Sequence, residues 1–265
     1  MSTSIHVVLL ASAICSVWAQ PKTGQPRVPR VGYLTGGEAP DVARIVPLAP
    51  TSGDSRDLRD VAVYKATRAF EGSARWALAQ SDNDVSTAGI LKAYSCSLGV
   101  ALTRDDAPLL TALITKATVD GTAAFNRLKK LNEQRKRPFL VVEGAICLPR
   151  PSGLEGNPDY PSGHTTFGWE VGLILAEIAP DAATAILSRA RAYGESRVVC
   201  GVHNVSAVEA GVMTATAVVA ALHGSAAFRT DLDTARSEFA QLRAGSSDKP
   251  LACPLEAETL SRNPY

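Results

Sequence analysis

The sequence predicts an all-α protein built as a single helical bundle. Three observations favour it: a composition rich in Ala, Leu and Val with only 6% aromatic residues, apolar residues that recur at helical spacing, and no useful run of strand-like alternation. At 265 residues the chain can bury a proper core within one generous domain. We therefore expect helices that each bury one apolar face against the others.

The helices can be placed in order from their apolar stripes. The stripes are Val63, Thr67 and Phe70; Ile90, Tyr94 and Ala101; Leu110, Leu113, Ala117, Ala124, Leu128 and Leu131; Phe167, Val171, Ile174 and Ile178; Val205, Val208, Val212, Val219 and Leu222; and Phe228, Leu232, Ala235, Phe239 and Leu242. Ser73 predicts the cap of a further short helix through Trp76. The third stripe belongs to a segment 105–136, whose acidic start and Pro108 suit a helix N-terminus. A loop follows at 149–160, and the next helix stops at Pro180.

Four segments describe the organisation of the chain. Residues 1–19 read as a signal peptide, and residues 20–58 are rich in Pro, Gly and Asp and predict an extended N-terminal arm. A helical domain spans 59–243, and the polar tail 244–265 is expected to be held mainly through Cys253.

The signal peptide is predicted from an apolar run over residues 7–14 and from Val17-Trp18-Ala19, which has the small-residue pattern of a cleavage site. Its first residues carry no Lys or Arg. We predict a protein that is periplasmic or secreted after this segment is removed.

Cleavage would leave four of the five cysteines: Cys96, Cys147, Cys200 and Cys253. An even number in an oxidising compartment predicts two disulfides, with three connectivities open, and the alternative is buried free thiols. None of the four stands beside a His at metal-ligand spacing, so we expect no metal cofactor.

Charge and hydropathy argue against two classes of partner. The 27 Lys and Arg nearly balance the 26 Asp and Glu, so no global field indicates nucleic acid or an acidic membrane surface. Beyond the signal, no stretch approaches the roughly 18 uninterrupted apolar residues of a membrane span, so we expect no membrane insertion.

Three blocks of the sequence carry the chemistry. In the first, Lys130 and Arg137 stand seven residues apart, nearly two helical turns, which predicts that both project from one face. A Lys point charge and an Arg fork suit phosphate oxygens, although a solvated basic face is the plainer alternative.

In the second block, Ser162 and Gly163 predict the start of a helix whose backbone N–H groups and dipole would meet an anion, with His164 on its first turn. The alternative is an ordinary capped helix with a surface His. Residues 151–153 repeat the Pro-Ser-Gly turn without a His, so the turn alone means little.

In the third block, Arg197 and His203 are six apart and would face opposite ways on one continuous helix. Gly201 predicts a break that lets both point into one site. A buried core His is the alternative.

In this order the blocks match KxxxxxxRP, PSGH and SRxxxxxHxxxD, the signature of the phosphatidic-acid-phosphatase-type superfamily, which also holds vanadium haloperoxidases. The chain most closely resembles its bacterial class A non-specific acid phosphatases, over roughly residues 45–245. Further matching positions are Arg75-Trp76, Ala79, Ser81-Asp82, Asp84, Pro138-Phe139, Tyr160, Thr165, Gly168-Trp169, residues 175–178, Glu195 and residues 198–201.

The resemblance implies a metal-independent acid phosphatase that hydrolyses small phosphate monoesters, with phosphotransfer to alcohols left open. His203 matches the nucleophile that forms a phosphohistidine, and His164 matches the general acid. The matching phosphate-binding residues are Lys130, Arg137, Ser162, Gly163 and Arg197. The two histidines would need opposite protonation states, which predicts a bell-shaped pH profile on the acid side. Vanadate is expected to inhibit as a phosphate mimic, and homo-oligomers are known in the family.

One position departs from the pattern. Ala207 stands where the family has the Asp that orients the nucleophile and stabilises its positive charge. We consider Ser206 or a backbone carbonyl as a substitute and predict a working but slower phosphatase. Asn204 replaces a bulkier aromatic residue, which predicts a wider mouth of the site.

Three other functions are compatible with parts of this sequence. A haloperoxidase would hold vanadate in the phosphate place, but those chains are much longer, and lipid phosphatases of this superfamily would need spanning helices. From a different class, loss of the Asp at Ala207 could leave an inactive phosphate- or vanadate-binding helical protein.

Overall fold

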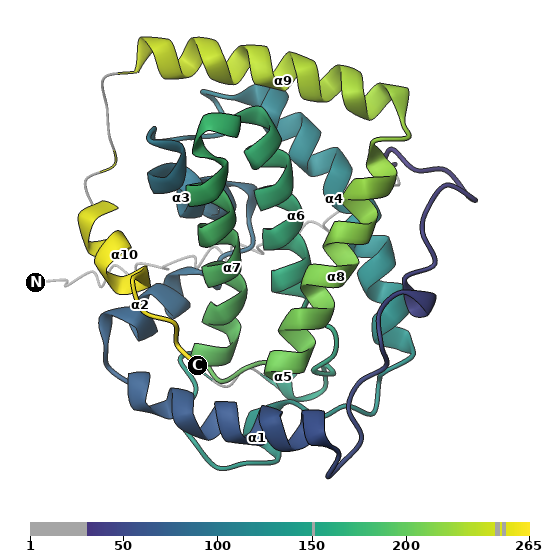
Figure 1. Cartoon of the computed structure of the whole chain (residues 1–265), viewed down its shortest axis with the longest axis vertical. Helices are drawn as coiled ribbons and strands as arrows, with labels where there is room; N and C mark the ends of the chain where they lie inside the picture. The colour runs from purple at the N-terminus through teal and green to yellow at the C-terminus, as the bar shows by residue number, and fades with distance from the viewer. Residues whose placement is uncertain (1–30, 150–151, 247–249, 251–252) are drawn as a thin grey trace, which may run out of the picture.

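The residues that the computed structural model describes, 31–149, 152–246, 250 and 253–265, form ten α-helices and no β-strand (Figure 1). The helices are α1 Ser55–Thr67, α2 Ala74–Ser81, α3 Thr87–Leu98, α4 Pro108–Lys130, α5 Ser152–Glu155, α6 Gly163–Ile178, α7 Ala183–Val199, α8 Val205–Leu222, α9 Ala226–Gly245 and α10 Cys253–Leu260. The prediction of an all-α fold is confirmed. The predicted signal peptide and the first residues of the predicted arm lie outside the described residues.

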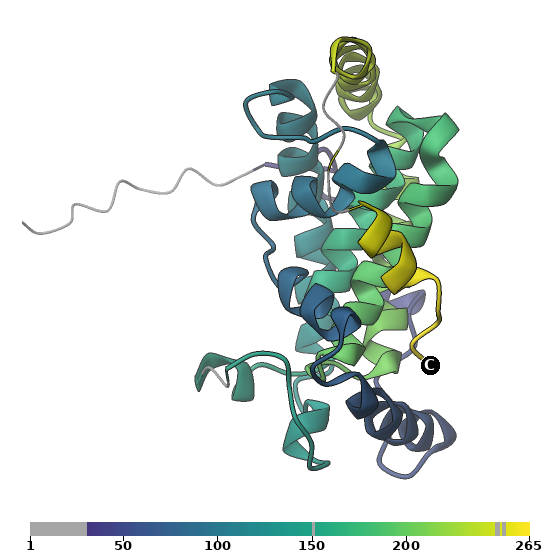
Figure 2. The same ribbon diagram turned by 90° about the vertical axis from the view of Figure 1, so that its left-hand side faces the viewer.

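Three central helices position the functional end of the molecule. α6 packs along both α7 and α8, and the chain reverses direction from each helix to the next. The N-termini of α6 and α8 and the C-terminus of α7 therefore meet at one end of the bundle. α4 packs against α6 and α8, α9 crosses the opposite end, and α1 crosses the end where the three termini meet (Figures 1 and 2).

Most predicted stripes face a common core. It includes Ile90, Tyr94, Leu110, Ile174 and Phe239, all at most 2% exposed. α8 has the length and apolar composition of a membrane span, in contrast to the sequence-based expectation, but 61% of its 18 residues are buried inside the bundle. Its apolar character is that of a core helix.

Side-chain caps decide where two early helices begin. The carboxylate of Asp54 accepts a hydrogen bond from the backbone N–H of Asp57 at 2.8 Å, so α1 begins four residues before the predicted start at 59. Ser73 caps α2 as predicted, accepting from the N–H of Trp76 at 3.2 Å.

Two predicted helices end earlier than expected. α3 ends at Leu98 because Gly99 adopts a φ of +73°, so Ala101 lies beyond it. α4 ends at Lys130, and turns carry the chain from there to Arg137. Lys130 and Arg137 are therefore not two turns apart on one helix face, and that prediction is wrong.

Three helices were not predicted. α5 is a single turn within the predicted loop, and α10 lies in the tail. α7 is the important omission, because it carries Arg197 and lies at the centre. Ala, Gly and buried polar residues surround its axis and leave no apolar stripe; its residues from Ala192 to Val199 are all buried. A helix buried on all sides has no amphipathic period to detect.

The cysteines form the two predicted disulfides, with a connectivity that the sequence left open. Cys147 pairs with Cys200 at the end of α7, and Cys96 on α3 pairs with Cys253 at the start of α10. The second bond attaches the tail to the domain, as expected for Cys253.

Candidate active site

A cavity of about 430 Å³ lies at the end of the bundle where the termini of α6, α7 and α8 meet. Four of the predicted side chains line it together: Arg137, His164, Arg197 and His203. Asn83, Gly163 and the rings of Phe125 and Phe167 also contribute to its wall. Among the described lining residues none is acidic, so the cavity presents cationic groups to whatever enters it.

A glycine turn brings Arg197 and His203 into the same cavity. After α7 ends, Gly201 adopts a φ of +78°, and the N–H groups of Val202 and His203 return to the carbonyl of Arg197 at 3.1 and 3.3 Å. A Cβ at position 201 would lie 2.5 Å from Nη1 of Arg68, so only glycine fits here. The predicted break at Gly201 is confirmed.

The hydrogen bonds of His203 specify its tautomer. Nδ1 lies 2.7 Å from the carbonyl oxygen of Asp159 and 3.1 Å from its Oδ1, two groups that can only accept when the carboxyl is ionised. On the other side, Nη1 of Arg137 lies 3.2 Å from Nε2, and a guanidinium can only donate. Nδ1 therefore carries the proton, and Nε2 keeps its lone pair.

Arg197 has two donors that remain to be satisfied. It is buried, and its Nη2 donates to Oδ1 of Asn83 at 3.1 Å, whereas Nε and Nη1 are buried and have no hydrogen-bond partner in the described part of the chain. Burial lowers the pKa of Arg197 to about 10, with the neighbouring charge of Arg137 adding to the effect. The residue remains a cation, and an oxyanion would satisfy both donors.

Arg137 is fixed by the backbone. Its Nε donates to the carbonyl of Asn157 and its Nη1 to that of Val202, both at 2.7 Å. Burial also lowers the pKa of Arg137. The guanidinium of Arg137 therefore contacts Nε2 of His203 and that of Arg197 lines the same cavity, with no acidic side chain among the described lining residues.

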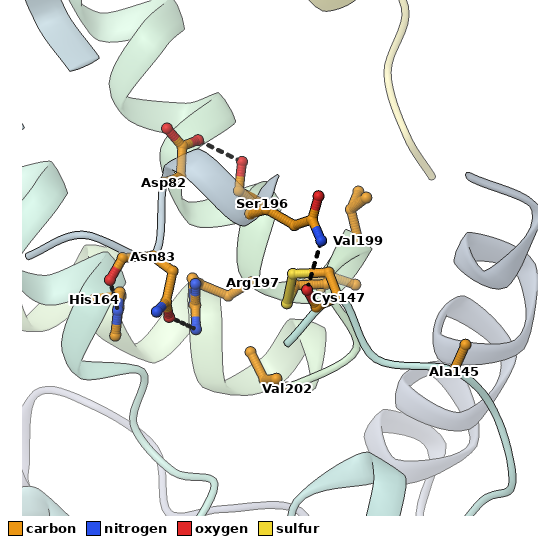
Figure 3. Close-up of a disulfide and its surroundings, with 12 residues drawn as sticks. Asp82, Asn83, Ala145, Cys147, His164, Ser196, Arg197, Val199 and Val202 are labelled. Atoms are coloured by element: carbon orange, nitrogen blue, oxygen red, sulfur yellow. Dashed lines mark hydrogen bonds between the residues drawn. A yellow bond between two sulfur atoms is a disulfide. The ribbon is translucent and has the colours of Figure 1, made fainter. Parts of the chain in front are cut away.

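His164 and Arg197 are linked through one residue, Asn83 (Figure 3). Nε2 of His164 lies 3.2 Å from the backbone carbonyl of Asn83, while the side-chain oxygen of Asn83 accepts from Arg197. Because a carbonyl can only accept, Nε2 of His164 carries a proton, and Nδ1 is the nitrogen that titrates. The residues on either side of Asn83 match the family, but no sequence motif predicted Asn83 itself as part of the site.

Burial and positive neighbours act on both histidines. The pKa of His203 lies well below its ordinary value because of burial and of Arg137 and Arg197. The pKa of His164 is also well below its ordinary value, again because of burial first and then Arg197 and His203. Without an anion in the cavity both rings are therefore neutral near pH 7.

A buried ion-pair network supports α7 behind the cavity. Asp82 pairs with Arg189 and accepts a hydrogen bond from the hydroxyl of Ser196 at 2.6 Å (Figure 3). Arg75 donates to the same hydroxyl at 2.8 Å. These bonds position Ser196, and so Arg197, relative to the loop that carries Asn83.

Of the other three predicted phosphate ligands, only Gly163 lines the cavity. Gly163 lines the cavity at the first turn of α6, as the helix-dipole argument requires. Ser162 is the N-cap of that helix, accepting from the N–H of Thr165 at 3.3 Å, and its side chain does not line the cavity. Lys130 is exposed at the end of α4 and lies outside the cavity wall.

Comparison with known proteins shows the family of this chain. Residues 107–231, which contain all three motif blocks, match the model of the PAP2 superfamily. The chain is 43% identical to an acid phosphatase of Zymomonas mobilis subsp. mobilis over 209 residues, which cover 78% of this chain and 79% of the relative. The chain belongs to the PAP2 superfamily, among its non-specific acid phosphatases.

Two further relatives match over most of their length. The non-specific acid phosphatase of Providencia stuartii is 35% identical over 81% of this chain and 87% of its own length. That of Salmonella typhimurium is 30% identical over 89% of this chain and 92% of its own length. The predictions of the family and of a phosphatase enzyme are confirmed.

In this acid phosphatase one of the two substitutes considered for the missing Asp contacts His203, because the backbone carbonyl of Asp159 lies 2.7 Å from Nδ1. Ser206 is not the partner of the ring, because its hydroxyl and its backbone N–H both donate to Asp60, at 2.6 and 2.9 Å. Asn204 donates through its backbone and side chain to the carboxylate of Asp159, at 3.1 and 2.9 Å. Asn204 is 5% exposed and absent from the cavity wall, so it does not widen the mouth.

Asp159 is the functional residue that sequence reasoning missed. It lies in the loop before α6, fully buried, and burial raises its pKa to about 6 against the lowering effect of the Asn204 hydrogen bonds. No motif marks it. The sequence indicates it only indirectly. Because Ala207 leaves His203 without the family's carboxylate, an Asp from another segment is needed to replace it.

Proposed function

We propose that this chain is an exported acid phosphatase that hydrolyses small phosphate monoesters through a phosphohistidine at His203, without a metal ion. The observation that carries the proposal is the pairing of two groups in one cationic cavity. The unprotonated Nε2 of His203 is a nucleophile, and the unpaired Nε and Nη1 of Arg197 are donors for phosphoryl oxygens.

In the first step, Nε2 of His203 attacks phosphorus, and the bond from phosphorus to the leaving oxygen breaks as the N–P bond forms. His164 donates a proton to the leaving oxygen. Because the pKa of His164 is lowered in the free enzyme, the bound dianion has to raise it. Substrate binding and protonation of the general acid are therefore coupled.

In the second step, water attacks phosphorus, the N–P bond breaks, and the water proton passes to His164. Inorganic phosphate leaves, and His203 recovers its starting tautomer. Asp159 accepts from Nδ1 throughout and so opposes the positive charge that the ring carries while it is phosphorylated.

Charge stabilisation needs no metal in this mechanism. Phosphoryl transfer depends mainly on positioning and on neutralising the equatorial oxygens, and Arg137, Arg197 and the N-terminus of α6 supply that. Lys130, which is exposed, would join them only after a change of side-chain conformation. The same cationic geometry explains why vanadate is expected to inhibit.

Export is supported by the two disulfides and by the signal-like segment at residues 1–19. Disulfide-bonded proteins accumulate in oxidising compartments, which agrees with a periplasmic or secreted enzyme. Formation of a homo-oligomer remains a prediction.

The test is hydrolysis of p-nitrophenyl phosphate with EDTA present, from about pH 4 to 8, a window that brackets histidine titration. We expect wild-type turnover that EDTA leaves unchanged, and a loss of about 10³-fold or more in His203→Ala. Radiolabelled phosphate should be trapped on the wild-type protein after an alkaline quench, but not on His203→Ala.

Two results would contradict the proposal. EDTA-sensitive turnover that survives in His203→Ala would exclude the phosphohistidine mechanism. Tight vanadate binding by a wild-type protein that releases no p-nitrophenol would instead favour the inactive binding protein.

A further inference from the structure

The carboxylate of Asp159 stands where a nucleophilic histidine needs an acceptor. Its Oδ1 lies 3.1 Å from Nδ1 of His203, and the backbone carbonyl of the same residue lies 2.7 Å from it. Both contacts hold the proton on Nδ1 and so leave Nε2 unprotonated, as a nucleophile must be. No other acidic side chain contacts the ring in the described part of the chain.

The carboxylate is itself held in place. Oδ1 accepts from the backbone N–H of Asn204 and Oδ2 from its side-chain amide, at 3.1 and 2.9 Å. Nε of Arg135 lies 4.0 Å from Oδ2, and the backbone N–H of Asp159 donates to the carbonyl of Arg135 at 2.9 Å. A buried carboxylate with this many donors has one orientation, and that orientation faces His203.

The position that supplies this carboxylate in the family pattern has a different role here. Ala207 is fully buried in an apolar cluster with Val42, Leu128 and Tyr160, and its carbonyl accepts the N–H of Ser162. Ala207, Asn204 and Asp159 therefore form a consistent set. Ala207 leaves α8 without a carboxylate at this position, and Asp159 provides one from the loop before α6. Asn204 holds the carboxylate of Asp159 in place.

We infer that Asp159 is the positioning residue of His203, and that its carboxylate replaces the one that is absent at position 207. This inference rests on the proposed function, because it assigns a role in the phosphohistidine step. Asp159 keeps its proton-accepting contact with Nδ1 while the N–P bond forms and breaks, and no proton leaves Nδ1. The enzyme is then not slowed by Ala207, in contrast to the sequence-based prediction.

The test compares Asp159→Asn with Asp60→Asn. Asp60 is a matched control, since it is also buried and contacts Arg135, but it receives hydrogen bonds from Ser206 and not from His203. We expect Asp159→Asn to lower kcat about 100-fold with KM changed less than about threefold, because the backbone carbonyl still selects the tautomer. Asp60→Asn should keep kcat within about threefold of wild type even where it lowers the melting temperature.

A spectroscopic readout separates positioning from simple loss of structure. In wild type the hydrogen-bonded Nδ1 proton of His203 should give a low-field ¹H signal that is absent in His203→Ala. The signal should move upfield in Asp159→Asn and stay in place in Asp60→Asn. Affinity for inorganic phosphate should remain within about threefold in Asp159→Asn, since the anion contacts other residues.

Two further variants test the inference, and the first of them does not require Asp159→Asn to fold. Asn204→Ala keeps the carboxylate of Asp159 but removes the side-chain amide that donates to it, and should lower kcat about tenfold. Ala207→Asp introduced into Asp159→Asn returns a carboxylate to the family position and should recover at least tenfold of the lost kcat.

The outcomes distinguish this inference from the proposed function. If His203→Ala retains turnover, the phosphohistidine function itself fails. If His203→Ala is inactive while Asp159→Asn keeps wild-type kcat and the same Nδ1 signal, only the role of Asp159 is overturned. An equal loss of kcat in Asp60→Asn and Asp159→Asn would also overturn it, since the effect would then be structural.

Discussion

His203 shows how single residues set the working range of the enzyme. Its ring is buried and feels the positive charges of Arg137 and Arg197, so its pKa is depressed well below the ordinary value. A histidine with a depressed pKa stays neutral, and therefore nucleophilic, to lower pH. The environment that binds an anion thus also keeps the nucleophile unprotonated in acid.

The first prediction concerns pH dependence. The acid limb of kcat/KM should lie below pH 6.5, the ordinary value for histidine, because His203 must be neutral. The basic limb of kcat should lie at higher pH than that of kcat/KM, because a bound dianion raises the pKa of His164. Profiles of both constants for p-nitrophenyl phosphate would show this, and coincident basic limbs would contradict it.

The second prediction concerns Arg197→Gln. Removing a guanidinium whose donors face the anion should lower kcat/KM by about 10²–10³-fold. It should also move the acid limb towards higher pH, because Arg197 lowers the pKa of both histidines. Steady-state profiles of the variant check both effects, and a rate loss without a shifted limb would contradict the electrostatic part.

The third prediction concerns Ala207→Asp in the wild-type background. The new carboxylate would enter an apolar cluster and duplicate the charge of Asp159, so we expect no gain in kcat. The free energy of unfolding should fall by about 2–5 kcal/mol at pH 7. Urea denaturation and steady-state kinetics measure the two effects, and a faster enzyme would show that Asp159 does not do the work of the missing Asp.

At the scale of elements, the contact of α4 with α6 depends on one small residue and one buried acid. Glu170 on α6 is fully buried against Gly121 on α4, where a Cβ would lie 1.9 Å from its Oε2. Its Oε1 has no hydrogen-bond partner among the described residues. Burial first, and then Asp120, raise the pKa of Glu170 well above its ordinary value.

The fourth prediction follows from that raised pKa. Between the ordinary value near 4.5 and the higher folded value, the unfolded chain releases the proton of Glu170 and the folded protein keeps it. The free energy of unfolding therefore falls by about 1.4 kcal/mol per pH unit in that window through this group. Glu170→Gln should remove this slope, so the free energy of unfolding of the variant should rise relative to that of wild type as pH rises. Urea denaturation at several pH values measures this difference. Parallel pH profiles of the two proteins would contradict it.

At the scale of the whole molecule, two disulfides tie distant segments to the bundle. Cys147–Cys200 joins segments 53 residues apart and lies three residues from both Arg197 and His203. Cys96–Cys253 joins segments 157 residues apart and attaches α10 to α3. The first supports the site as well as the fold, whereas the second supports the fold.

The fifth prediction separates these roles. Cys96→Ser with Cys253→Ser should lower the free energy of unfolding by about 5 kcal/mol, and Cys147→Ser with Cys200→Ser by about 4 kcal/mol, the loop-entropy values for loops of these lengths. Only the second pair should also lower kcat/KM, by about tenfold or more. Denaturation and kinetics of the two double variants would test this, and equal kinetic effects would contradict it.

The sequence by itself determined the fold class, the family and the arginine and histidine side chains of the cavity wall. Helical periodicity marked α3, α4, α6, α8 and α9, because each buries one face, and three motif blocks marked the two histidines and the arginines. It did not reveal α7, because the half of this helix from Ala192 to Val199 is buried on all sides and leaves no periodic pattern.

Only the tertiary structure decided which carboxylate faces His203. Asp159 lies 44 residues before it along the chain, outside any motif, and becomes its neighbour because α6 and α8 start at the same end of the bundle. The same holds for Asn83, which joins His164 to Arg197 from a loop far away in sequence. Periodicity and motif spacing report on contacts within a segment, whereas the partner of a buried polar group is settled by packing between segments.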